Sequence, residues 1–384
     1  HRLTLTGLRQ RIKPVEPEAY LRFLVRYHRL DSDEKWGGVN GTREVITRLQ
    51  GFEAPAGAWE SQLLAVRVPE YDPQCLDHLF MAGELVWGRL KPPRREEGGA
   101  SGLGMLTRTV PISLVMRDDL GWLLPPQPAV DPRCRSNAAA VLGALTNRGA
   151  LFFAQLQAET ELLPTHLEEA LRELATLGLV TSDSYAAVRA IVDRWRGGGG
   201  GTRGGRKRSS TARAPAGRWS LFPGRLGAVQ REQQVGQWCQ LLLQRYGVLF
   251  RELLTRESAA PPWHELVSLL RRLEGRGQLR GGRFVAGVAG EQFAREEAIQ
   301  LLRAVRDEPP DDPRRRRWVV ISAADPLNLV GIVTPGRRIP ASHKAALVLQ
   351  NGRCVGVKQA GAVTWENSLE GAERSEIEHA LRRC

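Results

Sequence analysis

Apolar residues and glycine recur along this chain in a ten-residue signature that appears three times. The three copies read Leu76-x-x-Leu79-x-x-x-Gly83-x-Leu85, Leu171-x-x-Leu174-x-x-x-Gly178-x-Val180 and Leu270-x-x-Leu273-x-x-x-Gly277-x-Leu279. Successive copies start 95 and 99 residues apart. Because a supersecondary unit that repeats at a nearly fixed distance is typical of tandem folds, the repeat predicts one structural unit used three times.

Each part of the signature has a physical reason. Leucines three positions apart lie on one face of a helix and pack inward together. A glycine four residues later is the usual left-handed terminator of a helix. The apolar residue two positions beyond it begins a strand that faces the same core. The signature therefore predicts a helix that ends at a glycine corner and continues into a β-hairpin.

An apolar helix is predicted before each copy, and proline follows it in the connection. These helices are predicted at 59–64, 151–156 and 248–254, and the prolines are Pro69 and Pro73, Pro164, and Pro261 and Pro262. Proline near the first turn of a helix is tolerated and fixes φ there. Helix, turn, helix and hairpin is the order of a winged helix. A generic helical hairpin is the alternative for any single copy, and the shared register of three copies favours tandem winged helices.

The same pattern divides the chain into domains of an α+β protein. The predicted segments are a winged-helix-containing domain at 1–125, a winged helix at 126–196, a disordered basic linker at 197–216, a winged helix at 217–312 and a β-barrel with a C-terminal helix at 313–384. Further helices are predicted at 16–28, 41–49, 138–145, 233–243 and 291–306, and a strand at 105–116. The glycine run and the basic residues of 197–216 predict disorder and loose contact with phosphates, or a spacer that is merely basic.

The pattern of residues along the sequence changes after the four arginines at 314–317. Short β-type runs at 318–322, 329–333, 346–349 and 354–358 are separated by turn residues. Asn351-Gly352 is a strong signal for a two-residue hairpin. We therefore predict a small β-barrel or meander over 313–365, followed by a helix near 369–381.

Composition narrows the classes of function. The formal net charge is +13 and the sequence pI is about 10.2, which favours a polyanionic partner such as nucleic acid, although a GC-rich genome can also enrich arginine. The sequence contains no apolar run long enough to span a membrane and no signal peptide, and its five cysteines show no CxxC spacing. We expect a cytoplasmic protein without metal or cofactor. His1 in place of methionine suggests a piece of a longer chain.

Arginines near the predicted wing tips are the candidate nucleic-acid contacts. Arg89 and Arg283 each lie six residues past the glycine that ends the preceding helix, while Ser184 occupies this position in the second copy. Arginine can bind a phosphate through two hydrogen bonds, although an arginine at a loop tip is often only a solvated charge. The candidates are completed by Arg280 in the third wing, and by Arg218 and Trp219, whose indole could stack on a base.

Residues that could catalyse a reaction are few. There is no nucleotide-binding GxxxxGK[ST] loop, and no zinc-ligand or Ser/His/Asp arrangement. Asp325 is the first candidate for a catalytic carboxylate, and Asp118 and Asp119 are the next candidates. A turn-capping role is the alternative for Asp325. Gln155-x-Gln157 pairs two amides at the end of a predicted helix, a pattern that coincidence explains at least as well as function.

Several longer motifs cover nearly the whole chain outside the linker. Among them are Gln50-Gly51-Phe52-Glu53-Ala54-Pro55-Ala56-Gly57-Ala58-Trp59-Glu60, Leu85-Val86-Trp87-Gly88-Arg89-Leu90, Gly217-Arg218-Trp219-Ser220-Leu221, Arg245-Tyr246-Gly247-Val248-Leu249-Phe250-Arg251 and Asp325-Pro326-Leu327-Asn328-Leu329. Together they resemble the C-terminal portion of the large helicase-related (Lhr) family of bacterial DNA helicases. The resemblance implies two upstream motor domains of the same polypeptide, followed by tandem winged helices and a β-barrel.

The resemblance also implies two functions. The first is a DNA-binding module of an ATP-dependent helicase in DNA repair, with the winged helices gripping single-stranded or duplex DNA. The arrangement is similar to that of winged-helix DNA glycosylases, and uracil excision is attributed to the C-terminal region of some long Lhr members. A DNA glycosylase module for uracil or alkylated bases is therefore the alternative, and a platform that forms a homo-oligomer is the second alternative.

Overall fold

The computed structural model describes residues 7, 9, 12–32, 35–92, 106–124, 134–193, 217–223, 229–308, 318–366 and 371–383. The chain forms two compact units. Unit 1 comprises His1–Leu49, Ala58–Tyr71 and Val229–Cys384, and unit 2 comprises Gln50–Gly57 and Asp72–Ala228. Within the described ranges, no helix combines the length and the apolar character that crossing a bilayer requires. The predicted linker at 197–216 and the arginines at 314–317 lie outside the described residues.

Three short antiparallel sheets share one topology, and each belongs to one copy of the repeat. In copy one the elements are α3 (Gly38–Leu49), β1 (Ala54–Pro55), η1 (Trp59–Leu64), α4 (Pro73–Met81), β2 (Leu85–Gly88) and β3 (Pro111–Met116). In copy two they are α6 (Ser136–Arg148), β4 (Leu151–Phe152), α7 (Phe153–Thr160), α8 (Pro164–Thr176), β5 (Val180–Ser182) and β6 (Arg218–Leu221). In copy three they are α10 (Arg231–Tyr246), β7 (Val248–Leu249), η4 (Arg251–Arg256), α11 (Trp263–Gly275), β8 (Arg280–Gly282) and β9 (Gln292–Ala294).

The third strand of each copy lies in the middle of its sheet. The strand orders are β1-β3-β2, β4-β6-β5 and β7-β9-β8. In every copy a helix precedes the first strand, two helices separate the first strand from the second, and the second and third strands form the wing. The prediction of tandem winged helices is therefore confirmed. The helix between the first strand and the glycine-ended helix varies, since η1 is a π-helix, α7 an α-helix and η4 a 3₁₀-helix.

Three glycines form matching corners between helix and strand. Gly83, Gly178 and Gly277 have φ values of 72°, 70° and 74°, a region that favours glycine over residues with a side chain. The amide of the residue after each glycine donates to a carbonyl five residues back. These bonds are Glu84 N to Leu79 O (3.0 Å), Leu179 N to Leu174 O (2.9 Å) and Gln278 N to Leu273 O (3.0 Å). Each corner is thus the hydrogen-bonded helix end that the signature predicted.

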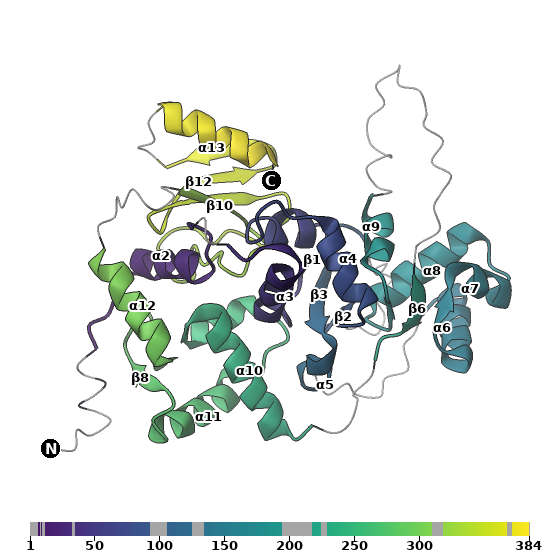
Figure 1. Cartoon of the computed structure of the whole chain (residues 1–384), viewed down its shortest axis with the longest axis horizontal. Helices are drawn as coiled ribbons and strands as arrows, with labels where there is room; N and C mark the ends of the chain where they lie inside the picture. Colours follow the sequence, from purple (N-terminus) through teal and green to yellow (C-terminus); the bar gives the residue numbers. More distant parts are fainter. Residues whose placement is uncertain are drawn as a thin grey trace. The chain divides into compact units, whose positions relative to one another are not determined.

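The wing of copy two contains an insertion that the sequence did not predict. Between β5 and β6 lies the helix α9 (Tyr185–Asp193), which packs beside α4 of copy one (Figure 1). Arg189 holds it there by donating to both carboxylate oxygens of Asp77 at 2.8 Å and to Pro73 O at 3.1 Å. The rings of Tyr185 and Phe80 also stack, with centroids 5.8 Å apart.

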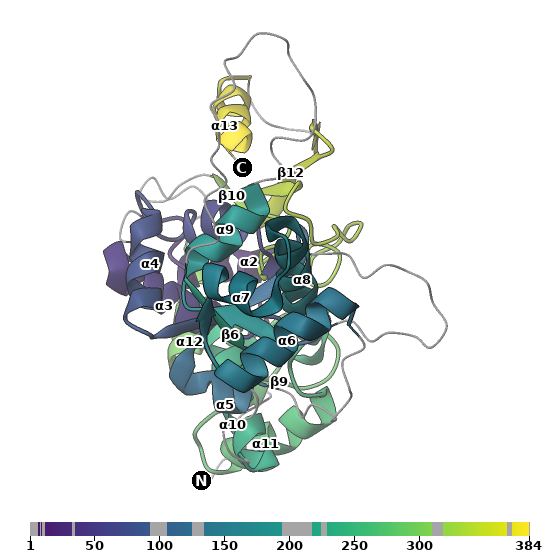
Figure 2. The same ribbon diagram turned by 90° about the vertical axis from the view of Figure 1, so that its right-hand side faces the viewer.

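Strand β6 belongs to copy two, whereas the sequence assigned residues 217–221 to the third domain. Its partners are β4 and β5, with Trp219 opposite both Leu151 and Ser182. Figure 2 shows β6 among the helices α6, α7 and α8 of copy two. The local sequence pattern does not indicate this pairing, because an insertion longer than either strand separates β5 from β6 along the chain.

The predicted helix at 291–306 is shorter than expected. Helix α12 covers Glu296–Asp307, and the preceding residues form β9. Gln292 explains the strand, because its fully buried side chain fills the wing. Its Oε1 accepts from the amides of Phe284 and Val285 at 2.8 Å, and its Nε2 donates to Val285 O at 2.9 Å. The prediction of a helix at 291–295 was wrong, because the side-chain amide of Gln292 must bind backbone groups across the hairpin.

The C-terminal module is an open meander. Strands β10 (Trp318–Ser322), β11 (Ala346–Gln350), β12 (Arg353–Gln359) and β13 (Ala362–Trp365) pair in sequence order. Among the described strands β10 and β13 are the two edges and do not pair, so the small β-barrel predicted from the sequence is not formed by them. Helix α13 (Gly371–Arg383) packs Ile377 and Leu381 onto the apolar face of this sheet.

Two details of this module test the sequence pattern. Asn351 and Gly352 have φ values of 50° and 80°, the conformation of the two-residue hairpin turn that was predicted. The expected strand at 329–333 is absent from the described residues. This segment instead turns on itself, with the amides of Ile332 and Val333 donating to Leu329 O at 3.1 and 2.9 Å. Gly331, with φ 69°, permits that turn.

The glycine corners give a matched pair of stability predictions. At Gly83 an added Cβ would meet no atom within 4 Å. Gly83→Ala should therefore lower the free energy of unfolding by about 1 kcal/mol, which is the cost of the left-handed backbone conformation alone. At Gly178 the Cβ would lie 2.7 Å from the carbonyl oxygen of Arg89. Gly178→Ala should therefore cost about 1–3 kcal/mol more, measured from denaturant unfolding. Equal losses in the two variants would contradict the close approach of Arg89 to the corner at Gly178.

Candidate functional site

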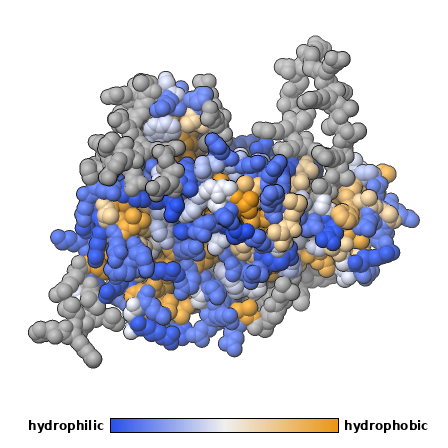
Figure 3. Space-filling view, in the orientation of Figure 1, coloured by the Kyte–Doolittle hydropathy of each residue, from blue (hydrophilic) through white to orange (hydrophobic). Residues whose placement is uncertain are grey.

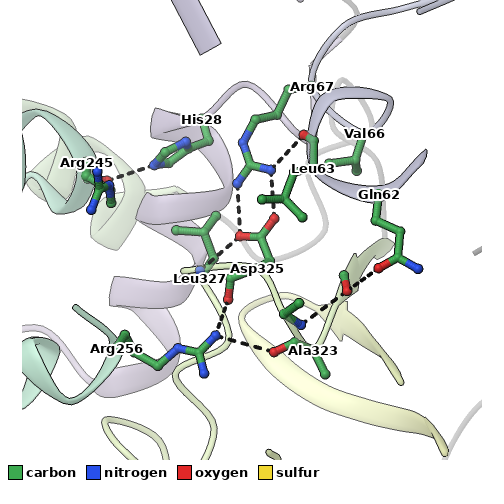
Figure 4. A network of polar contacts seen from close by, with 12 residues as sticks. His28, Gln62, Leu63, Val66, Arg67, Arg245, Arg256, Ala323, Asp325 and Leu327 are labelled. Carbon is green, nitrogen blue, oxygen red and sulfur yellow. Dashed lines mark hydrogen bonds and ion pairs between the residues drawn. The ribbon is translucent and has the colours of Figure 1, made fainter. Parts of the chain in front are cut away.

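Asp325 lies in the turn that follows β10 and is fully buried (Figure 4). Arg67, in the turn after η1, donates from Nη1 to Oδ2 at 2.7 Å and from Nη2 to Oδ1 at 3.0 Å. Leu327 N also donates to Oδ1 at 2.9 Å, and Asn328 N donates to Asp325 O at 3.0 Å. The carboxylate therefore closes its own turn and binds a guanidinium that is equally buried.

The electrostatics of this pair keep the carboxylate charged. Burial by itself would raise the pKa of Asp325, but the guanidinium of Arg67 and the amide of Leu327 outweigh burial and hold that pKa below its usual value. The neighbouring ring of His28 is fully buried as well. Burial and the charge of Arg67 lower the pKa of His28 to about 3, so its ring is neutral at pH 7 and Nε2 donates to Arg245 O at 2.7 Å.

Copy three contributes a second buried pair next to the first. Arg245 Nη1 donates to both carboxylate oxygens of Glu257 at 2.6 Å, and both side chains are fully buried. Tyr246 donates its hydroxyl to the same carboxylate at 2.7 Å. Arg256, from the end of η4, donates to Asp325 O at 2.8 Å. The cluster thus joins the end of α2 (Pro17–Tyr27), the turn after η1, copy three and the C-terminal meander within unit 1 (Figure 4).

Further hydrogen bonds extend this cluster to the edge of the meander. Ser322 donates its hydroxyl to Gln62 Oε1 at 2.6 Å, and Gln62 Nε2 donates to His343 O at 2.7 Å. The amide of Asn328 donates to Ala323 O at 2.8 Å and to Ile339 O at 3.0 Å. These bonds satisfy the buried side chains of Ser322 and Gln62 and the buried side-chain nitrogen of Asn328.

The geometry of Asp325 matches the turn-capping alternative that the sequence offered. A general base or acid in a glycosylase must reach the substrate or a water beside it. The carboxylate of Asp325 has no exposed surface, and both its oxygens accept hydrogen bonds from the protein. Arg67 was not singled out from the sequence, although an arginine between Val66 and Val68 in an apolar stretch signals a buried partner.

The predicted wing arginines occupy different surroundings. Arg283 is exposed beside β8, and Arg280 is exposed with its Nε 3.1 Å from Glu296 Oε2. Arg89 is half-buried, and its Nη1 donates to Thr176 O at 3.3 Å, near the end of α8. Burial lowers the pKa of Arg89 from its ordinary value. The wing of copy three therefore presents its arginines to solvent, while Arg89 of copy one also packs against copy two.

Arg218 and Trp219 lie in β6. Arg218 is exposed and its Nε donates to Asp183 Oδ2 at 2.9 Å. Trp219 is fully buried and meets Trp87 edge to face, with ring centroids 6.0 Å apart. Stacking of Trp219 on a base would therefore require the sheet of copy two to open. The indole couples copies one and two instead.

The remaining polar candidates have local partners. Gln155 Oε1 accepts from Phe152 N at 2.9 Å and so caps the start of α7. Asp119 accepts from Gln50 Nε2 at 2.8 Å and from Trp122 Nε1 at 2.9 Å. Asp118 is exposed. In the part of the chain that the structure describes, no group of three or more His, Cys, Asp or Glu residues is arranged to hold a metal ion.

Comparison with known proteins places two of the three copies. Residues 15–103 and 228–314 each match a winged-helix domain of the large helicase-related protein, the third and the fourth such domain respectively. The chain carries two Lhr winged-helix domains. Copy two lies between the matched ranges and has the same topology as the two Lhr domains on either side of it in the sequence.

Curated relatives of the Lhr domains are much longer proteins. The chain is 30% identical over 380 residues to the "Lhr helicase/ probable uracil glycosylase" of Mycolicibacterium smegmatis, with 92% of this chain and 24% of that protein covered. It is 26% identical over 392 residues to the "Lhr helicase/uracil glycosylase" of Escherichia coli, with 91% and 24% covered. The chain thus spans about a quarter of the length of these relatives.

A solved structure shares the fold of the whole chain. The DNA glycosylase AlkZ of Streptomyces sahachiroi is similar with a TM-score of 0.51 over 97% of each chain. The sequence identity is 13%, so this likeness concerns the fold alone. The fold of this chain is therefore shared by a protein of very different sequence.

The buried pair of Arg67 and Asp325 predicts a large and pH-dependent loss of stability. Arg67→Met leaves the Asp325 carboxylate buried without its cation, which should cost about 3–5 kcal/mol in denaturant unfolding at pH 7. The loss should shrink as the pH falls toward the ordinary pKa of aspartate, because the unpaired carboxyl can then take up a proton. Arg148→Met is the matched control, since Arg148 forms an exposed pair with Glu159 worth about 0–1 kcal/mol. A loss in Arg67→Met no larger than in this control would contradict the pairing.

Proposed function

We propose that this chain is the DNA-binding, C-terminal part of an Lhr-type ATP-dependent helicase, which holds DNA for motor domains of the same polypeptide. The observation that carries the proposal is the threefold winged-helix topology in a chain of which two copies match Lhr winged-helix domains. Winged helices are a common means of holding a nucleic-acid backbone while a helix enters a groove.

The charge of the chain supports a polyanionic partner. The net charge is +13, and residues 194–216 alone contain seven arginine and lysine residues without an acidic one. Among the described residues, the exposed wing of copy three adds Arg280 and Arg283. Several other described arginines, among them Arg26, Arg48 and Arg218, are paired with carboxylates, so phosphate binding is expected from a limited set of side chains.

DNA binding by the whole chain should weaken steeply with salt. Each phosphate contact releases condensed counterions, so a chain making several contacts should lose about a thousandfold in affinity between about 50 and about 200 mM salt. Arg283→Glu should weaken binding to a fluorescent duplex by about tenfold and lower the salt slope by about one unit. Arg353→Glu, an exposed arginine in the C-terminal meander, is the control. Salt-independent binding, or none, would refute the proposal.

A glycosylase module is the second candidate function. Its support is that both curated relatives carry uracil glycosylase in their names and that AlkZ, named a DNA glycosylase, has the same fold over nearly its whole length. The candidate catalytic carboxylate from the sequence is Asp325. Because it is buried and ion-paired, excision would require either a rearrangement of its turn or another residue.

A uracil-excision assay separates the two roles of Asp325. If Asp325 takes part in catalysis, Asp325→Asn should abolish abasic product from a uracil-containing oligonucleotide while circular dichroism shows a folded chain. Asparagine keeps an oxygen that can accept from Leu327 N, but it leaves the buried Arg67 without a counter-charge, so this variant is also assayed below its unfolding midpoint. Arg67→Met, assayed below its unfolding midpoint, should retain activity because it keeps the carboxylate. Absence of abasic product from the wild-type chain would remove this candidate function.

A further inference from the structure

The three glycine-ended helices α4, α8 and α11 can be compared position by position, because the signature aligns them. Nine residues before the corner glycine lie Gln74, Glu169 and Ser268, which are all exposed. Five residues before it lie His78, Glu173 and Arg272. The two positions are four apart and so share one face of each helix. In α8 the first of them, Glu169, is exposed, whereas Glu173 is buried and pairs with Arg135. The three copies offer different chemistry.

Copy two offers carboxylates. Helix α8 carries Glu168 and the exposed Glu169 in its first half, where a winged helix approaches DNA. The described residues of copy two, 134–193 and 217–223, contain seven acidic and five basic residues. Like charges would oppose the approach of phosphates to this helix. Figure 3 shows apolar surface over this region, and Phe152 and Leu163 are among its exposed residues.

In copy one the helix α9 binds along the side of the glycine-ended helix α4. Arg189 of α9 binds Asp77 and also Pro73 O, which lies in the first turn of α4. The side chain of Asp77 is therefore used for packing within unit 2, and a second helix lies along α4. No lysine or arginine occurs within α4 itself, whose sequence is Pro73–Met81.

Copy three offers hydroxyl, imidazole and guanidinium groups on an open face. His264, Ser268, Arg271 and Arg272 of α11 are all exposed, the two arginine side chains by 61% and 53%. The acidic residues of α11 are neutralised from elsewhere. Arg231 binds Glu265, and Arg9 binds the buried Glu274. Residues 229–308 contain twelve basic and ten acidic residues, the reverse of the balance in copy two.

The two exposed arginines of α11 form weak ion pairs with glutamates. Arg271 lies 2.6 Å from Glu291, and Arg272 lies 2.7 Å from Glu232, whose side chain is 67% exposed. An exposed ion pair contributes little to stability, whereas a phosphate can accept two hydrogen bonds from one guanidinium. Glu291 also pairs with Arg9, so it keeps a cation when Arg271 turns to a phosphate.

We propose that copy three is the DNA-reading copy, with the His264, Ser268, Arg271 and Arg272 face of α11 entering the groove of duplex DNA, while copies one and two form a packed pair that does not read DNA through α4 or α8. This inference rests on the proposed DNA-binding function and assigns it to one surface. The ligand is the duplex itself, recognised through phosphates by the arginines and through base edges by the shorter polar side chains.

Three variants of the whole chain test this assignment by fluorescence anisotropy with a blunt duplex of two helical turns. Arg271→Glu with Arg272→Glu should weaken binding at least tenfold and lower the salt slope by about two units, since about two phosphate contacts are lost. Glu232→Gln should strengthen binding by up to about fivefold, because it frees Arg272 from a surface pair. Ser268→Ala should weaken binding to duplex more than to single-stranded DNA of the same sequence.

Arg148→Glu in α6 is the matched control, because Arg148 is equally exposed and also pairs with a surface glutamate. It should change the affinity less than twofold, and all variants should keep the wild-type unfolding midpoint. If wild-type chain binds DNA and the α11 variants bind equally well, or if Arg148→Glu loses as much as they do, the assignment to copy three is overturned while DNA binding stands. If wild-type chain binds no duplex, the proposed function itself fails.

Discussion

The left-handed backbone at three corners is the constraint on which the repeated fold depends. Each glycine-ended helix must stop and turn within two residues so that its strand returns to the core that the helix covers. Only a residue with positive φ makes that turn, and glycine adopts it without a steric cost. The buried leucines before the corner and the buried apolar residue after it then face one core, as at Leu79 and Leu85. The wing and the helix before it are positioned together by this single turn.

Buried charge gives unit 1 a second kind of constraint. The pairs Arg67–Asp325 and Arg245–Glu257 lie among apolar side chains and leave no carboxylate uncompensated. Such pairs add little net stability over apolar packing, but removing one partner is costly, so they favour one arrangement of the segments that supply them. The neutral ring of His28 fits the same surroundings, because a protonated imidazole beside Arg67 would add a third positive charge.

The sequence predicted the features that local chemistry determines. The glycine corners, most helices and the Asn351-Gly352 turn follow from residues within one element, and they are confirmed. Features that depend on distant partners were missed. Strand β6 was assigned to the wrong copy because its partner β5 lies beyond an insertion, and Arg67 went unnoticed because its carboxylate is 258 residues away. Trp219 was a candidate for stacking on a base because it follows the basic linker in the sequence, whereas its burial in the sheet could be known only from the fold.

The insertion in copy two starts and ends at neighbouring points of one wing. Asp183 accepts from the amide of Arg218, and the amide of Asp183 donates to Arg218 O, so the two ends are fastened together at the base of the hairpin. The pairing of β5 with β6 is consequently independent of how many residues the insertion contains. A longer or shorter glycine- and arginine-rich stretch would therefore change the number of residues between copies two and three while leaving the sheet of copy two intact.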